Sequence, residues 1–503
     1  MSVISDGSVG NLAVIGAGIC GICTALALAK KGNKVTIYER DVPPPEGGAN
    51  EAFFEWRRKG AAQFRHPHAF LGLMCNILQD NYPELVEDFW AAGARKITFQ
   101  DMLPPNLRED YSSEPIDEKL WLLMCRRATM ETVLRRYAER QPNIVINNTT
   151  NVVGIRASVV DGIISVEALQ LMSQREKSEV AVDIVVDACG RTSKFTDWFE
   201  ELGAEIEVED DDSEIVYYTR HYQLLPGVDE PPRDGKDRSA GDLGYIKYGV
   251  FPGEEGHFAI IICLPTGEKK LREAVKSAEQ FDRICRSIPG LAPWVADDRS
   301  KSTTPPFGFG DIHAVWRHFV KDGKPAALNY FAVGDSAIRT NPLYGRGCST
   351  GILHAHLLAD VLTEIADPFQ RAIRFDQVTE EEIRPIFKAS LSEDKSGIKR
   401  AAAIKAGDTI HRADSLRKWL RLAFGDAIAA AARNEIHVIR GAMQTFNLLE
   451  KPGTFLKDWP VRLTIFRYFF RGRVRNAQAR MQRGPARKEM LDLVQVHLPI
   501  GGS

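Results

Sequence analysis

A Gly-x-Gly-x-x-Gly motif near the N-terminus constrains the fold of this chain more than any other feature. Residues 12–15 form a short apolar run, and Gly16, Gly18 and Gly21 follow it at the spacing of the motif. The pattern predicts a buried parallel strand, a tight turn at Gly16 and a helix over 22–31 that packs closely on the strand through Gly21. The chain therefore opens with a β-α-β unit, whose second strand is predicted over 34–38.

The same motif predicts a site for a dinucleotide. Gly18 lets the backbone approach a pyrophosphate, and the start of the helix presents free N–H groups to the phosphates. Glu39 lies 18 residues after Gly21, at the end of the second predicted strand, where a carboxylate can accept the ribose hydroxyls of an adenosine. This acid would repel a 2′-phosphate. We therefore expect FAD or NAD at this site rather than NADP.

Composition places the chain among ordinary globular enzymes. Its 503 residues are enough for two or three domains, and 44% of them are apolar. The net charge of −2 gives no global attraction to nucleic acid, and we expect no nucleic-acid partner. Met1 to Gly10 is polar and the eight cysteines are scattered, so we expect a cytoplasmic protein with free thiols. We expect no metal, because His66 and His68 have no evident third ligand.

The order of strand-like and helix-like segments predicts the architecture. We expect an α/β fold in which a Rossmann-type FAD-binding domain is interleaved with a β-sheet substrate domain and followed by a helical C-terminal region. The predicted FAD-binding domain is discontinuous, with residues 1–210 and 328–368. The β-rich substrate domain is predicted over 211–327 and the helical region over 369–503. Further helices are predicted over 69–92 and 118–140, and strands of the substrate sheet over 215–225, 244–251 and 257–264.

Two later segments complete a recognisable set. Residues 185–193 contain Asp187, Cys189 and Gly190, and residues 331–347 contain Asp335 in the order expected for a third part of the same site. Together with the glycine motif they resemble the FAD-dependent monooxygenases of the aromatic hydroxylase superfamily, in its epoxidase-like and halogenase-related branch. The resemblance covers roughly residues 10–365.

The resemblance implies roles for several residues. Asp335 would accept a hydrogen bond from the ribityl chain of FAD, and Arg127 would contact the diphosphate region. Pro342, Gly345 and Gly347 would shape a loop and helix start against the pyrimidine ring of the flavin, where the helix dipole can stabilise negative charge. Residues 58–68 resemble the family's loop beside the isoalloxazine. The set of cofactor-binding residues is therefore Gly16, Gly18, Gly21, Glu39, Arg127, Asp335, Pro342, Gly345 and Gly347.

The resemblance also implies a reaction. Reduced flavin reacts with dioxygen to give a C4a-hydroperoxide, which epoxidises or hydroxylates a lipophilic or aromatic small molecule. No protein nucleophile is needed, and the sequence singles out no catalytic residue. Cys189 stands where members that use NADPH directly usually carry an acid. Electrons are therefore expected either from reduced pyridine nucleotide or from a partner flavin reductase.

Three alternatives stay open at this point. A prenyl-chain reductase shares the Asp-Ala-x-Gly-Arg pattern of residues 187–191. A flavin-dependent halogenase is disfavoured, because the chain contains no Trp-x-Trp segment. A non-enzymatic flavin-binding protein is the alternative from another class.

The C-terminal region is unusually basic. Between Lys457 and Lys488 there are ten Lys or Arg residues and one acid, Asp458, with many aromatic residues interleaved. Such a segment either docks its apolar side on the catalytic domain, with the arginines directed outward, or makes a peripheral contact with an anionic membrane.

Overall fold

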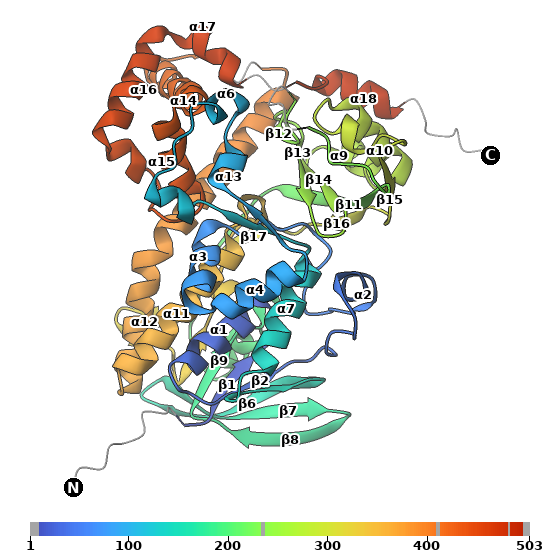
Figure 1. Cartoon of the computed structure of the whole chain (residues 1–503). Coiled ribbons are helices and arrows are strands. Elements are labelled where there is room, and N and C mark those ends of the chain that lie inside the picture. The colour runs from blue at the N-terminus through green and yellow to red at the C-terminus, as the bar shows by residue number, and fades with distance from the viewer. Residues whose placement is uncertain (1–9, 233–236, 409–412, 481–482, 496–503) are drawn as a thin grey trace, which may run out of the picture.

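The structure, a computed structural model, describes residues 10–232, 237–408, 413–480 and 483–495. Its centre is a five-stranded parallel sheet with the strand order β21–β9–β1–β2–β5 (Figure 1). Every neighbouring pair in this sheet is parallel. The strands are β1 (Leu12–Ile15), β2 (Val35–Tyr38), β5 (Ile144–Asn147), β9 (Ile184–Asp187) and β21 (Tyr330–Ala332).

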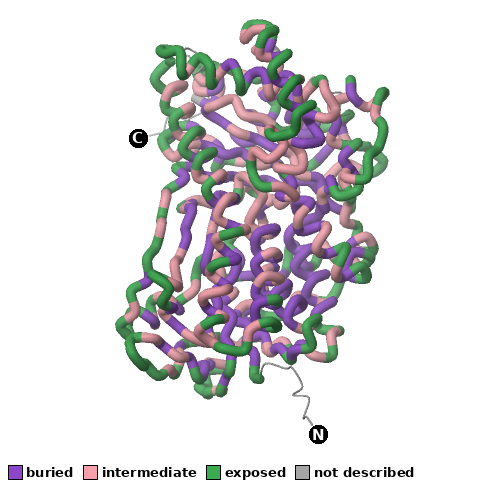
Figure 2. The backbone as a smooth tube through the Cα atoms, turned by 90° about the vertical axis from the view of Figure 1, so that its left-hand side faces the viewer, coloured by how far each residue is buried: buried purple, intermediate pink, exposed green. Residues whose placement is uncertain are grey.

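Helices cover one face of this sheet. Leu12 and Val14 of β1 point toward a core shared with the helices, whereas Ala13 and Ile15 point to the opposite face. Figure 2 shows this buried core in the interior of the molecule. The helices are α1 (Ile19–Lys30), α3 (Gly72–Asn81), α4 (Pro83–Ala91), α7 (Arg127–Glu139) and α11 (Gly347–Glu364).

A mainly antiparallel sheet covers the other face. Its long hairpin turns at Asp161 and Gly162, which both have positive φ values, of 53° and 71°. The Asp-Gly pair in the sequence is typical of such a turn. The elements on this face are β6 (Thr150–Val160), β7 (Ile163–Ser173), β8 (Glu176–Ala181), β20 (Ala327–Leu328) and α8 (Phe195–Glu201).

A second large sheet, in which every strand pair is antiparallel, forms the predicted substrate side. Its central pair joins β11 (Ile215–Leu224) to β14 (His257–Pro265). The other strands are β12 (Ala240–Asp242), β13 (Lys247–Pro252), β15 (Ser300–Ser302) and β16 (Phe307–Phe309). One face packs on α9 (Lys269–Ala274), α10 (Ala278–Ser287) and α18 (Arg487–Gln495). A smaller sheet of β10 (Glu207–Asp212), β17 (His313–His318) and β22 (Ile338–Arg339) links the two large ones.

The C-terminal region is helical. Arg440 pairs with the buried Asp117 (2.7 Å), and the side chain of Asn447 accepts the N–H of Gly72 at the start of α3 (2.7 Å), so the region is fixed to the FAD side. No helix of the described residues is long and apolar enough to cross a bilayer. The helices are α12 (Pro368–Glu382), α13 (Arg384–Lys405), α14 (Leu416–Asn434), α15 (Ile436–Phe446), α16 (Trp459–Arg471) and α17 (Arg473–Asn476).

The predicted fold class is confirmed, and two predicted helices need correction. The segment 69–92 is two helices, because Pro83 lacks an N–H and starts α4 instead of continuing α3. The segment 118–140 contains β4 (Leu122–Met124), whose Leu123 exchanges backbone hydrogen bonds with Phe70. The domain boundaries at residues 210, 328 and 368 stay predictions. Other short elements are α2 (Ala49–Glu55), β3 (Arg95–Ile97), α5 (Phe99–Met102) and α6 (Pro105–Arg108).

Candidate functional site

A cavity of about 700 Å³ lies at the carboxyl ends of the parallel strands. β1 lies between β2 and β9, so the strand order changes direction at β1. Such a switch point is where α/β sheets bind ligands. All three segments of the sequence contribute to its wall. Of the predicted cofactor-binding residues, all but Gly21 line the cavity: Gly16, Gly18, Glu39, Arg127, Asp335, Pro342, Gly345 and Gly347.

The three glycines of the first motif have different surroundings. Gly16 has a φ of +101°, and a Cβ there would lie 2.7 Å from the carbonyl oxygen of Ala188. Gly21 lies behind the cavity, because a Cβ on it would lie 1.9 Å from the carbonyl oxygen of Gly16. A Cβ on Gly18 would meet no atom within 4 Å. Gly18 therefore leaves open space beside the start of α1, where the motif places a pyrophosphate.

Glu39 is fixed as a carboxylate at the end of β2. Its two oxygens accept the N–H groups of Ala17 and Asp41, each at 2.8 Å, and Arg58 lies 3.2 Å away. Burial alone would raise the pKa of Glu39, but Arg58 and the two amides outweigh burial and hold the pKa below its ordinary value. Glu39 is therefore negatively charged at neutral pH.

Arg58 is the centre of a buried charge network that the sequence did not reveal. It pairs with Glu39, with Asp41 (3.2 Å) and with Glu131 of α7 (3.0 Å). Glu131 also pairs with Arg127 (2.6 Å). The prediction that residues 58–68 lie beside the isoalloxazine therefore does not suit Arg58, which lies at the Glu39 end of the cavity.

The second and third segments are joined by the fully buried carboxylate of Asp187. It accepts hydrogen bonds from the backbone N–H of Cys189 and the hydroxyl of Ser193 within its own loop. It also accepts the hydroxyls of Tyr330 (3.0 Å) and Ser336 (3.1 Å) from the third segment. Asp187 therefore holds the two loops together and does not only order its own.

Asp335 lies next to this junction and faces the cavity. Among the described residues, no hydrogen-bond donor contacts its carboxylate. Burial raises the pKa of Asp335 above its ordinary value, and the charges of Arg339 and Arg127 only partly oppose that rise. The carboxylate is thus free to accept a hydrogen bond from a ligand.

The loop from Thr340 to Gly347 forms the far end of the cavity. Gly345 has a φ of +66°, and the first turn of α11 has no side-chain cap. The hydroxyl of Thr340 lines the cavity and is buried without a hydrogen-bond partner among the described residues. The N–H groups at the start of α11 and the hydroxyl of Thr340 are therefore available to a bound group.

The substrate side of this loop is apolar. Leu343 packs against a cluster of the substrate sheet that contains Tyr217 of β11, and Phe309 of β16 packs against the same cluster. Because residues alternate along β11, Tyr217 and Thr219 face this loop, whereas Tyr218 and Tyr222 belong to the core under α10. The aromatic run of residues 217–222 therefore contributes both to the packing against the cofactor loop and to the core under α10.

His66 and His68 belong to an irregular loop rather than to a strand, so they do not share a face. His66 Nδ1 lies 2.9 Å from the hydroxyl of Thr219. His68 Nδ1 donates to the carbonyl of His66 (2.9 Å), so His68 Nε2 accepts from Arg127 (3.0 Å). Burial, with the charge of Arg127 added, lowers the pKa of His66 to about 4 and that of His68 to about 3. Both rings are neutral at pH 7.

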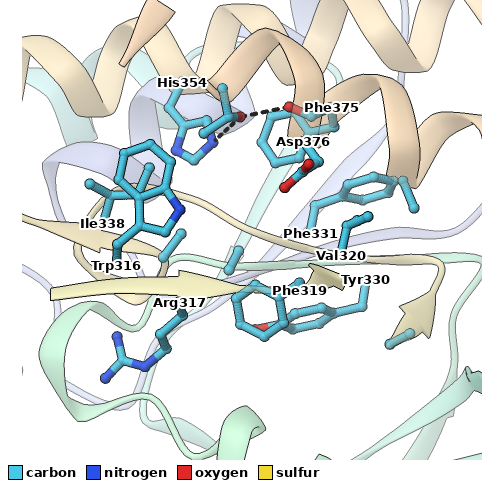
Figure 3. Close-up of a pocket in the computed structure, with 15 residues that line it drawn as sticks. Trp316, Arg317, Phe319, Val320, Tyr330, Phe331, Ile338, His354, Phe375 and Asp376 are labelled. Carbon is cyan, nitrogen blue, oxygen red and sulfur yellow. Dashed lines mark hydrogen bonds between the residues drawn. The ribbon is translucent and has the colours of Figure 1, made fainter. Parts of the chain in front are cut away.

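A separate small cavity of about 50 Å³ lies between β17, β21 and α12 (Figure 3). Aromatic side chains and His354 surround it, and burial raises the pKa of Asp376 in its wall to about 6. His354 is hydrogen-bonded to Thr379 (3.1 Å) and stacks on Phe375, as a packing role requires. This cavity has room for a few water molecules at most.

The large cavity fits FAD. Its volume is in the range of ligand sites, at roughly 300–1,000 Å³. Gly18 leaves open space beside α1, Glu39 is a charged acceptor at the end of β2, and Asp335 is a free acceptor farther along. The buried hydroxyl of Thr340 lacks a protein partner among the described residues, which a ligand would supply.

A family model named for the same cofactor matches this chain, and one known protein shares sequence with it. The model of the family "FAD dependent oxidoreductase" matches residues 11–100. Protein Rv3254 of Mycobacterium tuberculosis is 27% identical over 370 residues, which are 69% of this chain and 73% of that protein.

Solved structures of flavoproteins share the fold. PqsL, a probable FAD-dependent monooxygenase from Pseudomonas aeruginosa, has a TM-score of 0.54 and 15% identity over 78% of this chain and 98% of its own. The p-nitrophenol 4-monooxygenase PnpA from Pseudomonas putida has a TM-score of 0.55 and 15% identity over 88% of this chain and 99% of its own. The family match over residues 11–100 and the cavity support an FAD-dependent oxidoreductase, and the chain shares its fold with flavin monooxygenases.

Proposed function

We propose that the protein is an FAD-dependent monooxygenase that transfers one oxygen atom of dioxygen to a lipophilic or aromatic small molecule, by hydroxylation or epoxidation. Bound FAD, once reduced, would supply the two electrons and activate the oxygen. One oxygen atom enters the product, and the other leaves as water with two protons. The proposal rests mainly on one observation, which is the apolar contact between the cofactor loop and the substrate sheet.

The residues of the loop suit this chemistry. The N-terminal turn of α11 directs uncapped N–H groups at the loop end of the cavity, where they can stabilise the negative charge of a reduced flavin ring. Leu343, Tyr217 and Phe309 would keep water from the reacting atoms. The neutral His66 offers a polar atom without a charge next to this apolar wall. A substrate that stacks or packs, rather than one that forms ion pairs, suits such a wall.

Nine residues are proposed to hold FAD. Gly16, Gly18 and Gly21 form the pyrophosphate turn, and Glu39 binds the adenosine ribose. Asp335 binds the ribityl chain, and Arg127 contacts the diphosphate region. Pro342, Gly345 and Gly347 shape the backbone at the flavin ring.

Replacing Asp335 with alanine should weaken FAD binding selectively. The change removes a charged acceptor for a ribityl hydroxyl, which contributes on the order of 1.5–3 kcal/mol, so the dissociation constant of FAD should rise roughly ten- to a hundredfold. Fluorescence titration of the apoprotein measures it. Asp376→Ala is the matched control, because this carboxylate lines only the small cavity. Equal FAD affinity in the wild type and in Asp335→Ala would remove Asp335 from the site.

Oxygen labelling tests the reaction itself. Enzyme with chemically reduced FAD is mixed with ¹⁸O₂ and a panel of lipophilic and aromatic compounds. The masses of the products are then measured by mass spectrometry. A monooxygenase gives a product with one ¹⁸O atom, and H₂¹⁸O with unlabelled dioxygen gives none. A product formed without dioxygen that has gained two hydrogen atoms would instead show a reductase. A halogenated product that requires added halide would show a halogenase.

We propose a separate flavin reductase as the source of electrons. Glu39 disfavours NADP at the first motif, and the sequence has no second dinucleotide fingerprint. Cys189 carries no charge that could serve a pyridine nucleotide, because burial raises the pKa of its thiol. In anaerobic stopped-flow experiments, NADH or NADPH alone should therefore reduce the bound FAD slowly, and a flavin reductase should restore turnover. Reduction by NADH or NADPH at catalytic rates once substrate is added would refute the need for this partner.

We also propose that the C-terminal helices make a peripheral contact with a membrane. This proposal is independent of the oxygen chemistry.

A further inference from the structure

The helix α16 has two apolar faces, and only one of them is covered. With 100° between successive residues, Val461, Ile465 and Tyr468 share one face, which packs on α14 and α15. The opposite face also carries large apolar side chains, and these are exposed by 50–81%: Trp459, Leu463, Phe466 and Phe470. A docked helix normally exposes a polar face instead.

The exposed face continues onto the neighbouring helices. Val474 of α17, the helix that directly follows α16, is 89% exposed. The ring of Phe469 contacts the rings of both Phe470 and Trp419, so the stripe reaches the first turns of α14. We name this surface the apolar patch: Leu416, Trp419, Leu420, Trp459, Leu463, Phe466, Phe470 and Val474. In Figure 1, α14, α16 and α17 lie together at the end of the molecule away from the parallel sheet.

Arginines border the apolar patch on both sides. On the wheel of α16, Arg462 lies on one edge of the exposed stripe, and Arg467 and Arg471 lie on the other. Two of the carboxylates near these helices are engaged, since Asp426 is buried against Arg473 and Asp414 pairs with Lys418, whereas Asp458 is exposed at the start of α16. Within the described part of the chain, no carboxylate pairs with the exposed side chains Arg417, Arg421, Arg467 and Arg475.

We propose that the apolar patch docks on an anionic lipid surface, with α16 lying in the plane of the interface. Aromatic and leucine side chains would enter the boundary of the acyl chains, while the arginines would extend to the lipid phosphates. A second copy of this chain fits the patch less well, because a symmetric pairing would bring the same arginines against each other. This inference concerns where the protein works, and it stands whether or not the proposed oxygen transfer is correct.

Flotation of the full-length, FAD-loaded protein with vesicles tests the proposal. Vesicles of phosphatidylglycerol and phosphatidylcholine should carry the protein upward at low salt, and vesicles of phosphatidylcholine alone should carry much less. High salt should weaken the binding, because the arginines act partly through charge. No flotation with the anionic vesicles at low salt would overturn the proposal.

Matched variants locate the surface. The double variant Phe466→Ser/Phe470→Ser should lower partition into anionic vesicles by at least about tenfold, since two exposed aromatic side chains no longer enter the interface. The double variant Arg467→Gln/Arg471→Gln should lower binding to anionic vesicles. Its binding to vesicles of phosphatidylcholine alone should not change. Val160→Ser is the control, because Val160 is 66% exposed on the β6–β7 hairpin, outside the patch.

Two further readouts keep the result unambiguous. FAD content and the thermal unfolding midpoint should match the wild type in every variant, since all of the changed side chains are exposed. Light scattering over a range of protein concentrations reports self-association. A dimer that the Phe466→Ser/Phe470→Ser variant abolishes would assign the patch to a second copy and overturn the lipid proposal. Equal loss of vesicle binding in Val160→Ser would overturn it as well.

Discussion

The carboxylate of Asp187 is the point on which the cofactor site depends. It lies at the end of β9, fully buried, and four donors from two separate segments converge on it. A buried carboxylate without such donors would be costly, so the loops after β9 and β21 must come together for the chain to fold. Ser336, which supplies one of these donors, is the residue directly after Asp335. The same interaction that closes the fold therefore places the free carboxylate of Asp335 in the cavity.

A second buried network connects the two ends of the cavity. Arg58 fixes Glu39 at the ribose end and holds Glu131 of α7, and Glu131 orients Arg127. Arg127 in turn donates to the neutral His68, which is hydrogen-bonded to the carbonyl of His66. The ring of His66 is hydrogen-bonded to Thr219 of the substrate sheet. Buried ion pairs of this kind contribute little net stability, but removal of one partner leaves an uncompensated charge. The network thus specifies the positions of its members more than it stabilises the fold.

Local sequence spacing predicted much of this architecture. The glycine motif, the strand that ends in Glu39, the turn at Asp161 and Gly162 and the strands around residues 215–264 depend on neighbours within a few residues, and the structure has them there. Pairings across long stretches of chain were not predictable in this way. Arg58 and Glu131 are 73 residues apart, and Asp187 and Ser336 are 149 apart. Likewise, periodicity showed that α16 is rich in aromatic residues, but only packing decides which of its two apolar faces is buried.

The central claim is that three separated segments form one non-covalent FAD site. Titration of the purified apoprotein with FAD, followed by absorbance and calorimetry and then by acid precipitation, tests it most directly. The account predicts saturation at one FAD per chain, with the yellow cofactor released into the supernatant by acid. No saturable binding, or colour that stays with the precipitated protein, would contradict it.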